Sequence, residues 1–151
     1  MGLLDLLGIN QENEIFCVGD ILKVPRRIGV LRYYHFGVYV GGNQVVHFTN
    51  YGPNNDIFDG FNMKEARIQK TSIDIFADGA SISVDKSEFP MYSGYAVAER
   101  AESRIGDLYG DYNVVDMNCE HFANWCRTNT YKCNQSRFVL MQILDMGAFR
   151  L

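Results

Sequence analysis

At 151 residues, with 47% apolar and 21% charged residues, the chain has the size and balance of a globular protein with its own hydrophobic core. Its formal net charge of -4 disfavours a nucleic-acid-binding function, because contacts with phosphates need a surplus of clustered Lys and Arg. No apolar run approaches the roughly 18 residues that a membrane-spanning helix needs. We therefore expect a single domain over residues 1–151 that neither binds nucleic acid nor spans a membrane.

The four cysteines are Cys17, Cys119, Cys126 and Cys133, and they form no C-x-x-C pair. A chain of this size and apolar content does not depend on disulfides for its stability. We therefore expect thiols in a reducing compartment, which indicates a cytoplasmic protein. A zinc site is not expected, because the candidate ligands lack a spacing signature.

The first half of the chain predicts β-structure. Asp20–Val24 is expected to be a short strand that ends at Pro25. Residues 35–50 (HFGVYVGGNQVVHFTN) predict a β-hairpin, because β-branched and aromatic residues flank Gly41–Asn43. Residues 66–76 alternate well enough for a further strand. Two segments rich in turn residues are expected to be loops: 51–62 and 77–94.

The second half predicts three helices. Ser93, Asn118 and Ser136 are the expected N-caps, since each precedes a segment with apolar residues at helical spacing. The apolar positions of the first two helices are Val97, Ala101, Ile105 and Leu108, then Cys119, Phe122, Ala123 and Cys126. The third helix is expected to run to Gly147. Strands followed by helices predict an α+β fold, an antiparallel β-sheet with helices packed on it.

Cys119 falls in the first turn of the helix expected behind Asn118. Unpaired N–H groups and the macrodipole at the start of a helix stabilise an anion, so a thiolate at such a position is a competent nucleophile. The alternative is a small buried hydrophobic residue on an apolar helix face, which is how most cysteines are used. On this feature alone, we favour the alternative.

Three histidines are available as a base for such a thiol: His35, His47 and His121. His121 lies two residues after Cys119, so on a helix it points away from the sulfur and is expected to be structural. His35 and His47 lie on the two strands of the predicted hairpin. Whether they act together depends on the loop between those strands.

A three-residue loop at Gly41–Asn43 would pair Gly37 with His47 and His35 with Thr49. Both histidines would then share one face as diagonal neighbours, about 7–8 Å apart between Cα atoms. The missing side chain of Gly37 would leave room for another group beside His47. A two-residue loop is expected to place the histidines on opposite faces. A nucleophile, a base and a group that orients the base are the recurring requirement for acyl transfer, so this pairing makes catalysis as well supported as a structural role.

The segments HFGVYVGGNQVVHF and NCEHF resemble the H-box and NC motifs of the lecithin:retinol acyltransferase-like family. Within that family the chain is most similar to the HRAS-like suppressor phospholipase A/acyltransferases. VGDILKVPR and AERAESRIGDLYGDYNVVDMNCEHFANWCR extend the resemblance over most of the chain. The resemblance implies a permuted papain-like or NlpC-like fold, in which the nucleophile lies late in the chain. It also implies removal of a fatty acyl chain from a glycerophospholipid, through a thioester, to water or to an amine or hydroxyl acceptor.

The same resemblance implies roles for four residues. Cys119 matches the nucleophile, and His35 matches the general base that deprotonates it. His47 matches the residue that orients and polarises His35. Tyr33 matches a tyrosine that helps to hold the oxyanion together with backbone N–H groups. No cofactor or metal is implied.

Two other functions stay open at this point. The papain-like arrangement serves amides as well as esters, so a peptidase or amidase is one alternative. The other is a non-catalytic interaction module in which the His and Cys residues only stabilise the fold. A lipid substrate predicts an apolar groove near Cys119, whereas a peptidase predicts an open polar cleft.

The expected partners are a phospholipid substrate and a membrane surface contacted peripherally, with no obligate protein partner. Met1–Ile9 and a basic stretch around Pro25 are candidates for the membrane contact, although a solvated loop is the favoured interpretation of the stretch. The basic stretch comprises Lys23, Arg26, Arg27 and Arg32. The segment Asn50–Asn62, which follows His47, is the candidate for a lid over the site.

Overall fold

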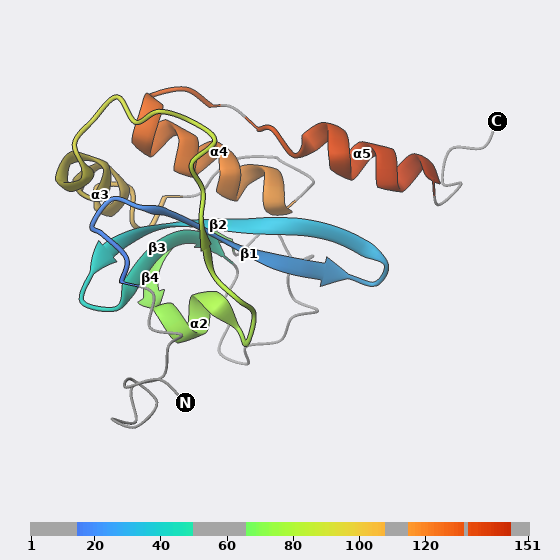
Figure 1. Ribbon diagram of the computed structural model, residues 1–151, viewed down its shortest axis with the longest axis horizontal. Coiled ribbons are helices and arrows are strands. Elements are labelled where there is room, and N and C mark those ends of the chain that lie inside the picture. The colour runs from blue at the N-terminus through green and yellow to red at the C-terminus, as the bar shows by residue number, and fades with distance from the viewer. Residues whose placement is uncertain (1–14, 50–65, 108–114, 132, 146–151) are drawn as a thin grey trace, which may run out of the picture.

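The computed structural model of the protein describes residues 15–49, 66–107, 115–131 and 133–145. These residues form a five-stranded antiparallel sheet in the order β4-β3-β2-β1-β5, with helices on both faces (Figure 1). The strands are β1 (Ile21–Ile28), β2 (Leu31–Gly41), β3 (Gln44–Thr49), β4 (Arg67–Ser72) and β5 (Ser83–Val84). The helices are α2 (Ile73–Ala77), α3 (Gly94–Glu102), α4 (Val115–Thr128) and α5 (Ser136–Asp145). The α+β class expected from the sequence is confirmed.

Some expectations concern residues outside the described ranges. They are the membrane contact at Met1–Ile9, the lid at Asn50–Asn62, and the helix positions at Leu108 and Gly147.

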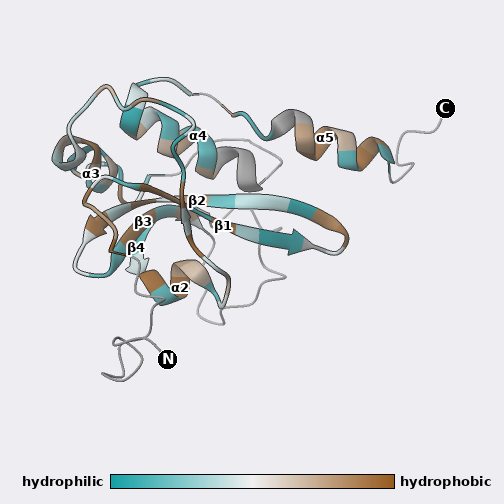
Figure 2. Ribbon diagram, in the orientation of Figure 1, coloured by the Kyte–Doolittle hydropathy of each residue, from teal (hydrophilic) through white to brown (hydrophobic). Residues whose placement is uncertain are grey.

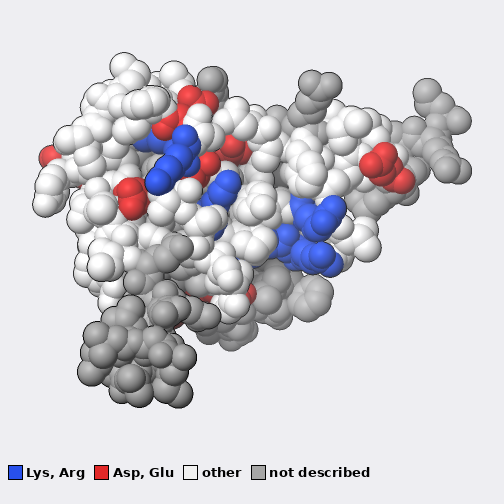
Figure 3. Space-filling model, viewed as in Figure 1, with Lys and Arg blue, Asp and Glu red and all other residues white. Residues whose placement is uncertain are grey.

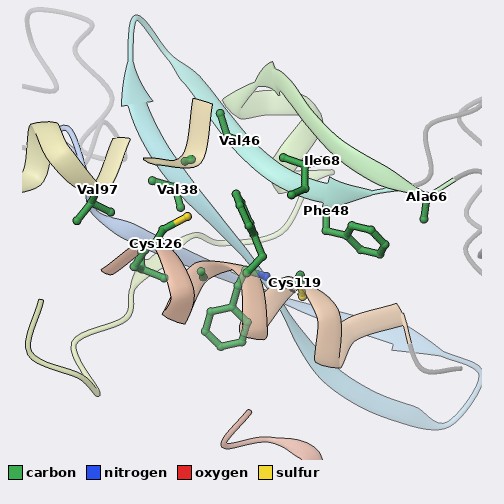
Figure 4. Packing of buried hydrophobic residues seen from close by; sticks show 13 residues of the cluster. Val38, Val46, Phe48, Ala66, Ile68, Val97, Cys119 and Cys126 are labelled. Atoms are coloured by element: carbon green, nitrogen blue, oxygen red, sulfur yellow. Dashed lines mark hydrogen bonds between the residues drawn. The ribbon is translucent and has the colours of Figure 1, made fainter. Parts of the chain in front are cut away.

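The sheet has two apolar faces, because successive side chains of a strand point to opposite sides. One face packs against α3 and α4, and the other packs against α2 (Figure 1). Figure 4 labels members of the first cluster: Val38, Val46, Phe48, Ala66, Ile68, Val97, Cys119 and Cys126. The second cluster comprises Leu22, Val24, Val45 and Phe76. The sheet therefore lies between α4, which carries Cys119, and α2.

The β2–β3 hairpin has a two-residue turn instead of the expected three-residue loop. Gly42–Asn43 have φ angles of 59° and 57°, the left-handed values that a type I′ turn needs at both positions. Gly41 pairs with Gln44, and a register shift just before Gly41 leaves one extra residue on β2. Because this β-bulge offsets the pairing by one residue, Gly37 still faces His47. The expected loop is wrong, but the expected pairing of Gly37 with His47 is confirmed.

Beyond the short pairing with β5, strands β1 and β2 continue as a two-stranded ribbon. Pro25 lies inside β1, opposite Tyr34, so the expected strand end at Pro25 is wrong. The N–H and C=O of Tyr34 both bond to the side chain of Gln135, on the side away from β1. The Pro25–Tyr34 pair therefore exchanges no ladder bonds, and a residue without an N–H is tolerated there. The basic stretch accordingly lies in strands and not in a loop.

Two of the shorter elements begin at hydroxyl caps. Ser93 caps α3 as expected, since its Oγ accepts a hydrogen bond of 3.2 Å from the third helical residue. This helix ends at Glu102, before Ile105. The strand expected over 66–76 ends at Ser72, whose hydroxyl accepts a bond of 3.3 Å from Ile75 and so starts α2.

The starts of the two C-terminal helices differ from expectation. Asn118 lies inside α4, so it is not the N-cap, and Cys119 lies in the second turn of the helix as described. The macrodipole acts mainly within the first turn, so it favours a thiolate at Cys119 less than the sequence suggested. Ser136 is the first helical residue of α5 and not its cap, because the preceding Gln135 accepts the first helical bond, at 2.9 Å.

Candidate active site

His35 and His47 lie side by side on the α2 face of the sheet. A hydrogen bond of 2.7 Å joins Nε2 of His35 to Nδ1 of His47, and the ring centroids are 5.0 Å apart in an edge-on arrangement. Both side chains are buried, with His47 fully inaccessible. The prediction that the hairpin places both histidines on one face is confirmed.

Thr71 of β4 continues this hydrogen-bonded chain. Its Oγ1 lies 2.8 Å from Nε2 of His47 and donates to the carbonyl oxygen of Ser72 at 3.2 Å. Since the hydroxyl has one proton, this bond to Ser72 leaves an oxygen lone pair that can accept a proton carried by Nε2 of His47. Sequence reasoning missed Thr71, because only the pairing of β3 with β4 brings it beside His47.

Phe76 and Arg26 hold the histidine pair from the side of α2. The Phe76 ring centroid lies 5.3 Å from that of His35 and 5.2 Å from that of His47. Arg26 of β1 donates to the carbonyl oxygens of Phe76 at 2.5 Å and of Ala77 at 2.9 Å, where the end of a helix leaves carbonyls without intrahelical partners. Arg26 thereby fixes α2 against the two imidazoles.

Phe76 also fills the space that Gly37 leaves. A Cβ on Gly37 would lie 2.5 Å from Cγ1 of Val45 and 2.8 Å from Cε2 of Phe76. The room expected beside His47 is therefore present, but core side chains occupy it.

Burial lowers the pKa of both imidazoles, because removal from water disfavours the charged form. The pKa of His35 lies well below 6.5, chiefly through burial and further through the nearby His47 and Arg26. Burial and then Arg26 lower the pKa of His47 from 6.5 to about 3. Both rings are therefore neutral near pH 7, the state in which an imidazole accepts a proton.

Cys119 comes from the opposite side of the sheet, yet its sulfur lies against the backbone on both sides of His35. The N–H of Phe36 donates to Sγ at 3.4 Å, and Sγ lies 3.9 Å from the carbonyl oxygen of Tyr34. The thiol is fully buried. The structure thus brings Cys119 to the strand segment that carries His35.

The sulfur reaches this segment where two strands part. The pairing of β2 with β3 ends at Gly37 and His47, although β3 continues to Thr49. Beyond this last pair, the backbone groups of β2 that point away from β1 are open to other partners. The sulfur of Cys119 is one of those partners.

Tyr33, the expected oxyanion residue, is buried on β2, two residues before His35 and on the same face of the strand. It lies directly opposite Arg26 of β1. Its position in the fold therefore agrees with proximity to the histidine pair, while its role stays a prediction.

The sequence profile of the lecithin retinol acyltransferase family matches residues 14–132. The chain belongs to the lecithin retinol acyltransferase family. The resemblance carried by HFGVYVGGNQVVHF and NCEHF is thereby confirmed. The permuted papain-like description of this fold stays a prediction.

Named members of the lecithin retinol acyltransferase family are similar to the chain over most of its length. Human lecithin retinol acyltransferase is 30% identical over 138 residues, which cover 79% of this chain and 57% of the relative. The mouse protein of the same name is 31% identical over 141 residues, covering 80% and 58%. Human phospholipase A and acyltransferase 2 is 25% identical over 128 residues, covering 78% and 74%. The chain thus spans little more than half the length of the lecithin retinol acyltransferases that it matches.

Two properties of the described residues bear on other kinds of site in this family member. Within those ranges, no helix is both long and apolar enough to cross a membrane. The same ranges contain no group of three or more His, Cys, Asp or Glu residues arranged to hold a metal ion.

The buried neutral histidines predict that acid destabilises the protein. Between about pH 3 and 6.5 the unfolded chain binds protons at His47 that the folded chain does not bind, so the free energy of unfolding falls as the pH is lowered through this window. The slope is at most about 1.4 kcal/mol per pH unit for each such histidine. Urea denaturation at pH 7.5, 6.0 and 5.0 measures this dependence of the free energy of unfolding on pH.

The variant His47→Gln should be less stable at pH 7.5 but should lose less stability on acidification than the wild type. His121→Gln is the matched control, because His121 is only partly buried and its removal should leave most of the slope. Equal slopes for the wild type and His47→Gln would contradict the assignment of a neutral, buried His47.

Proposed function

We propose that the protein is a thiol-dependent phospholipase A or acyltransferase in which Cys119 is the nucleophile and His35 its general base. The observation that carries the proposal is the position of the Cys119 sulfur, 3.4 Å from N of Phe36 and 3.9 Å from O of Tyr34. These two residues flank His35, a neutral histidine that is bonded to a second histidine. Relatives named as lecithin retinol acyltransferase and as phospholipase A and acyltransferase support a lipid ester substrate over a peptide.

The hydrogen-bonded chain supports one tautomer for each imidazole. Thr71 accepts from Nε2–H of His47, which leaves Nδ1 of His47 as an acceptor for Nε2–H of His35. Nδ1 of His35 then carries a lone pair. In this scheme that nitrogen is the base, and His47 orients the ring and stabilises the imidazolium that forms.

The proposed reaction starts with transfer of the Cys119 proton to Nδ1 of His35. The thiolate attacks the ester carbonyl carbon of a glycerophospholipid, and the carbonyl electron pair moves onto oxygen. Tyr33 is proposed to donate a hydrogen bond to this oxyanion. When the tetrahedral intermediate collapses, the lysolipid oxygen leaves with the proton of His35, and the acyl chain remains on Cys119 as a thioester. Water, or an amine or hydroxyl acceptor deprotonated by His35, then attacks the thioester and restores the thiol.

The thioester is the intermediate to detect. Incubation with a phosphatidylcholine that carries a labelled acyl chain should leave an acyl mass adduct on Cys119, labile to hydroxylamine. Cys119→Ala should abolish the adduct. Cys126→Ala is the matched control on the same helix, because burial raises the pKa of the Cys126 thiol and keeps it protonated, so its loss should leave the adduct intact.

Variants of the histidine chain should rank by their distance from the sulfur. His35→Ala should slow adduct formation by more than the about 10²- to 10⁴-fold typical of a lost general base, since the residues act as a unit. His47→Ala should cost less, because His47 only orients, and Thr71→Val should cost less again. An adduct that survives in Cys119→Ala would identify another nucleophile, and a wild type that cleaves a peptide ester but forms no phospholipid adduct would favour the peptidase alternative.

A membrane surface is the proposed partner. The two-stranded ribbon of β1 and β2 is the proposed place of contact. Lys23 of the basic stretch pairs with Asp85 at 3.8 Å, and Arg26 is bound to α2. Arg27 and Arg32, in contrast, face each other across β1 and β2 with both side chains exposed. Like charges directly opposite on a sheet are destabilising, so the sheet itself does not explain this pair, whereas an anionic headgroup would. Figure 3 shows one group of Lys and Arg side chains over the ribbon, at the right of the view, whereas those at the left lie among Asp and Glu side chains.

The apolar surface next to these arginines supports the same partner. Val30 at the ribbon tip is 74% exposed, and α5, which bonds to the ribbon through Gln142 and Arg32, carries an exposed apolar group. Figure 2 shows hydrophobic residues both on α5 and at the ribbon tip. The group on α5 comprises Phe138, Leu140, Met141 and Leu144. Arginines beside exposed apolar side chains are the combination that binds the interface of an anionic bilayer.

Vesicle sedimentation tests this surface. Vesicles of phosphatidylcholine and phosphatidylserine should bind the wild type in a salt-dependent manner, and the double variant Arg27→Glu/Arg32→Glu should bind them weakly. The control Arg67→Glu/Lys86→Glu carries the same change of charge at exposed positions elsewhere and should bind like the wild type. Equal binding by the two double variants would contradict the proposed surface.

A further inference from the structure

Part of strand β2 has no neighbouring strand on one side. Its pairing with β3 covers Gly37–Gly41, whereas β2 begins at Leu31. Every second residue before Gly37 directs its backbone N–H and C=O away from β1, and these groups have no ladder partner from β3. Backbone N–H and C=O groups that lack partners are costly where water is excluded.

Two glutamine side chains supply the missing partners. The amide of Gln135 accepts from N–H of Tyr34 at 2.9 Å and donates to the carbonyl oxygen of Tyr34 at 2.9 Å. The amide of Gln142 does the same at Arg32, accepting at 2.9 Å and donating at 2.6 Å. A primary amide has one carbonyl and one NH₂ group, so each glutamine reproduces the pair of bonds that one residue of an antiparallel strand would make. Gln135 directly precedes α5, and Gln142 lies within it, seven positions later.

The main chain of Gln135 is tied to the residue that follows Cys119. The carboxylate of Glu120, which is buried, accepts from N–H of Gln135 at 3.1 Å and from N–H of Asn134 at 2.9 Å. It also accepts from the thiol of Cys133 at 3.1 Å. A buried carboxylate is retained only when such donors satisfy it. The start of α5 is therefore fixed to α4 next to Cys119.

Together these contacts form a closed circuit that links Cys119 to the residue before His35. Glu120 connects α4 to the main chain of Gln135, the Gln135 side chain connects to the peptide groups of Tyr34, and the Tyr34 carbonyl lies 3.9 Å from Sγ of Cys119. One arm of the circuit fixes the helix that carries the sulfur. The other arm fixes the strand residue that directly precedes His35.

We infer that Gln135 is a positioning residue, which sets the separation and orientation of Cys119 and His35 through its bonds to Glu120 and Tyr34. The inference rests on the proposed function, since it concerns the same nucleophile and base. A displacement of about 1 Å between reacting groups can cost about 10²-fold in rate, so a bridge of this kind acts on the chemical step more than on substrate binding. Gln142 makes the same two bonds to the same strand but has no bond to Glu120, and it lies farther along β2 from the site.

This duplication provides a matched pair of variants. Gln135→Met and Gln142→Met each remove an amide that makes two bonds to β2 and keep the length of the side chain. Both should lower the melting temperature, Gln135→Met by more, because the bonds of Gln135 to Tyr34 are partly buried and those of Gln142 to Arg32 are exposed. Activity is measured on a short-chain phosphatidylcholine in solution, because Gln142 holds α5 to Arg32 in the proposed membrane-binding surface. On this substrate only Gln135→Met should lower kcat, by about 10-fold to 10²-fold with little change in KM. A purely structural role for Gln135 would move the melting temperature without separating the two variants in kcat.

A second readout does not depend on the substrate. The measurement is the rate at which iodoacetamide alkylates Cys119, recorded as a function of pH. The pH profile of this rate should differ from that of the wild type in Gln135→Met and match it in Gln142→Met, because only Gln135→Met alters the contact between thiol and base. If Gln135→Met does not fold, Glu120→Gln replaces it, since one amide oxygen cannot satisfy all the donors of the carboxylate, and it should show the same two changes in weaker form. Equal kcat values and equal alkylation profiles for the two positions would overturn the inference. Absence of any thioester in the wild type, with the alkylation difference intact, would instead overturn the proposed substrate and leave the positioning role standing.

Discussion

The candidate site depends on the parting of β2 from β3 beyond the Gly37–His47 pair. An antiparallel ladder that continued along β2 would occupy its backbone groups and would separate α4 from the face that carries the histidines. Because the ladder stops there, the N–H of Phe36 is available to Sγ of Cys119 at 3.4 Å, and the peptide of Tyr34 is available to Gln135. A thiol on one side of the sheet thereby comes to the same strand segment as an imidazole on the other.

The second constraint is the burial of two uncharged imidazoles. A buried polar atom without a partner costs about 1–3 kcal/mol, so a histidine pair in an apolar layer is stable only if its nitrogens are satisfied. The bond between the rings and the Thr71 hydroxyl account for Nε2 of His35 and for both nitrogens of His47. Burial and Arg26 disfavour the charged forms of both rings. The arrangement therefore leaves a neutral base for the proposed proton transfer, at the cost of stability in acid.

The sequence predicts those parts of the fold and of the candidate site that depend on residues close together in the chain. The motifs HFGVYVGGNQVVHF and NCEHF predict the family and bring Cys119, His35 and His47 into consideration, because the residue types and their spacing are local. The sequence predicts correctly that the histidines share a face, but it does so from a three-residue loop that the structure does not have. A two-residue turn alone would shift the register by one residue, and a bulge in β2 restores it. Gly41, with a φ of 91°, lies at this bulge, but a glycine there fits a three-residue loop equally well, so the sequence does not distinguish the two.

Other parts of the site arise from contacts between distant segments. Asn118 was expected to cap α4, and the helix instead begins earlier, because a residue suited to a cap also fits inside a helix when tertiary contacts favour it. Thr71 lies 24 positions from His47, and Gln135 lies 101 positions from Tyr34. Polar residues of this kind are common on any surface, and only the folded chain distinguishes the ones that complete a hydrogen-bonded network.

The protonation of His35 is the central claim, and ¹⁵N NMR of the histidine side chains measures it most directly. The account predicts that His35 is protonated at Nε2 only, with a lone pair on Nδ1, and that neither His35 nor His47 gains a proton between pH 7.5 and 5.5. A His35 ring protonated at Nδ1, or titration of either ring near pH 6.5, would contradict the account.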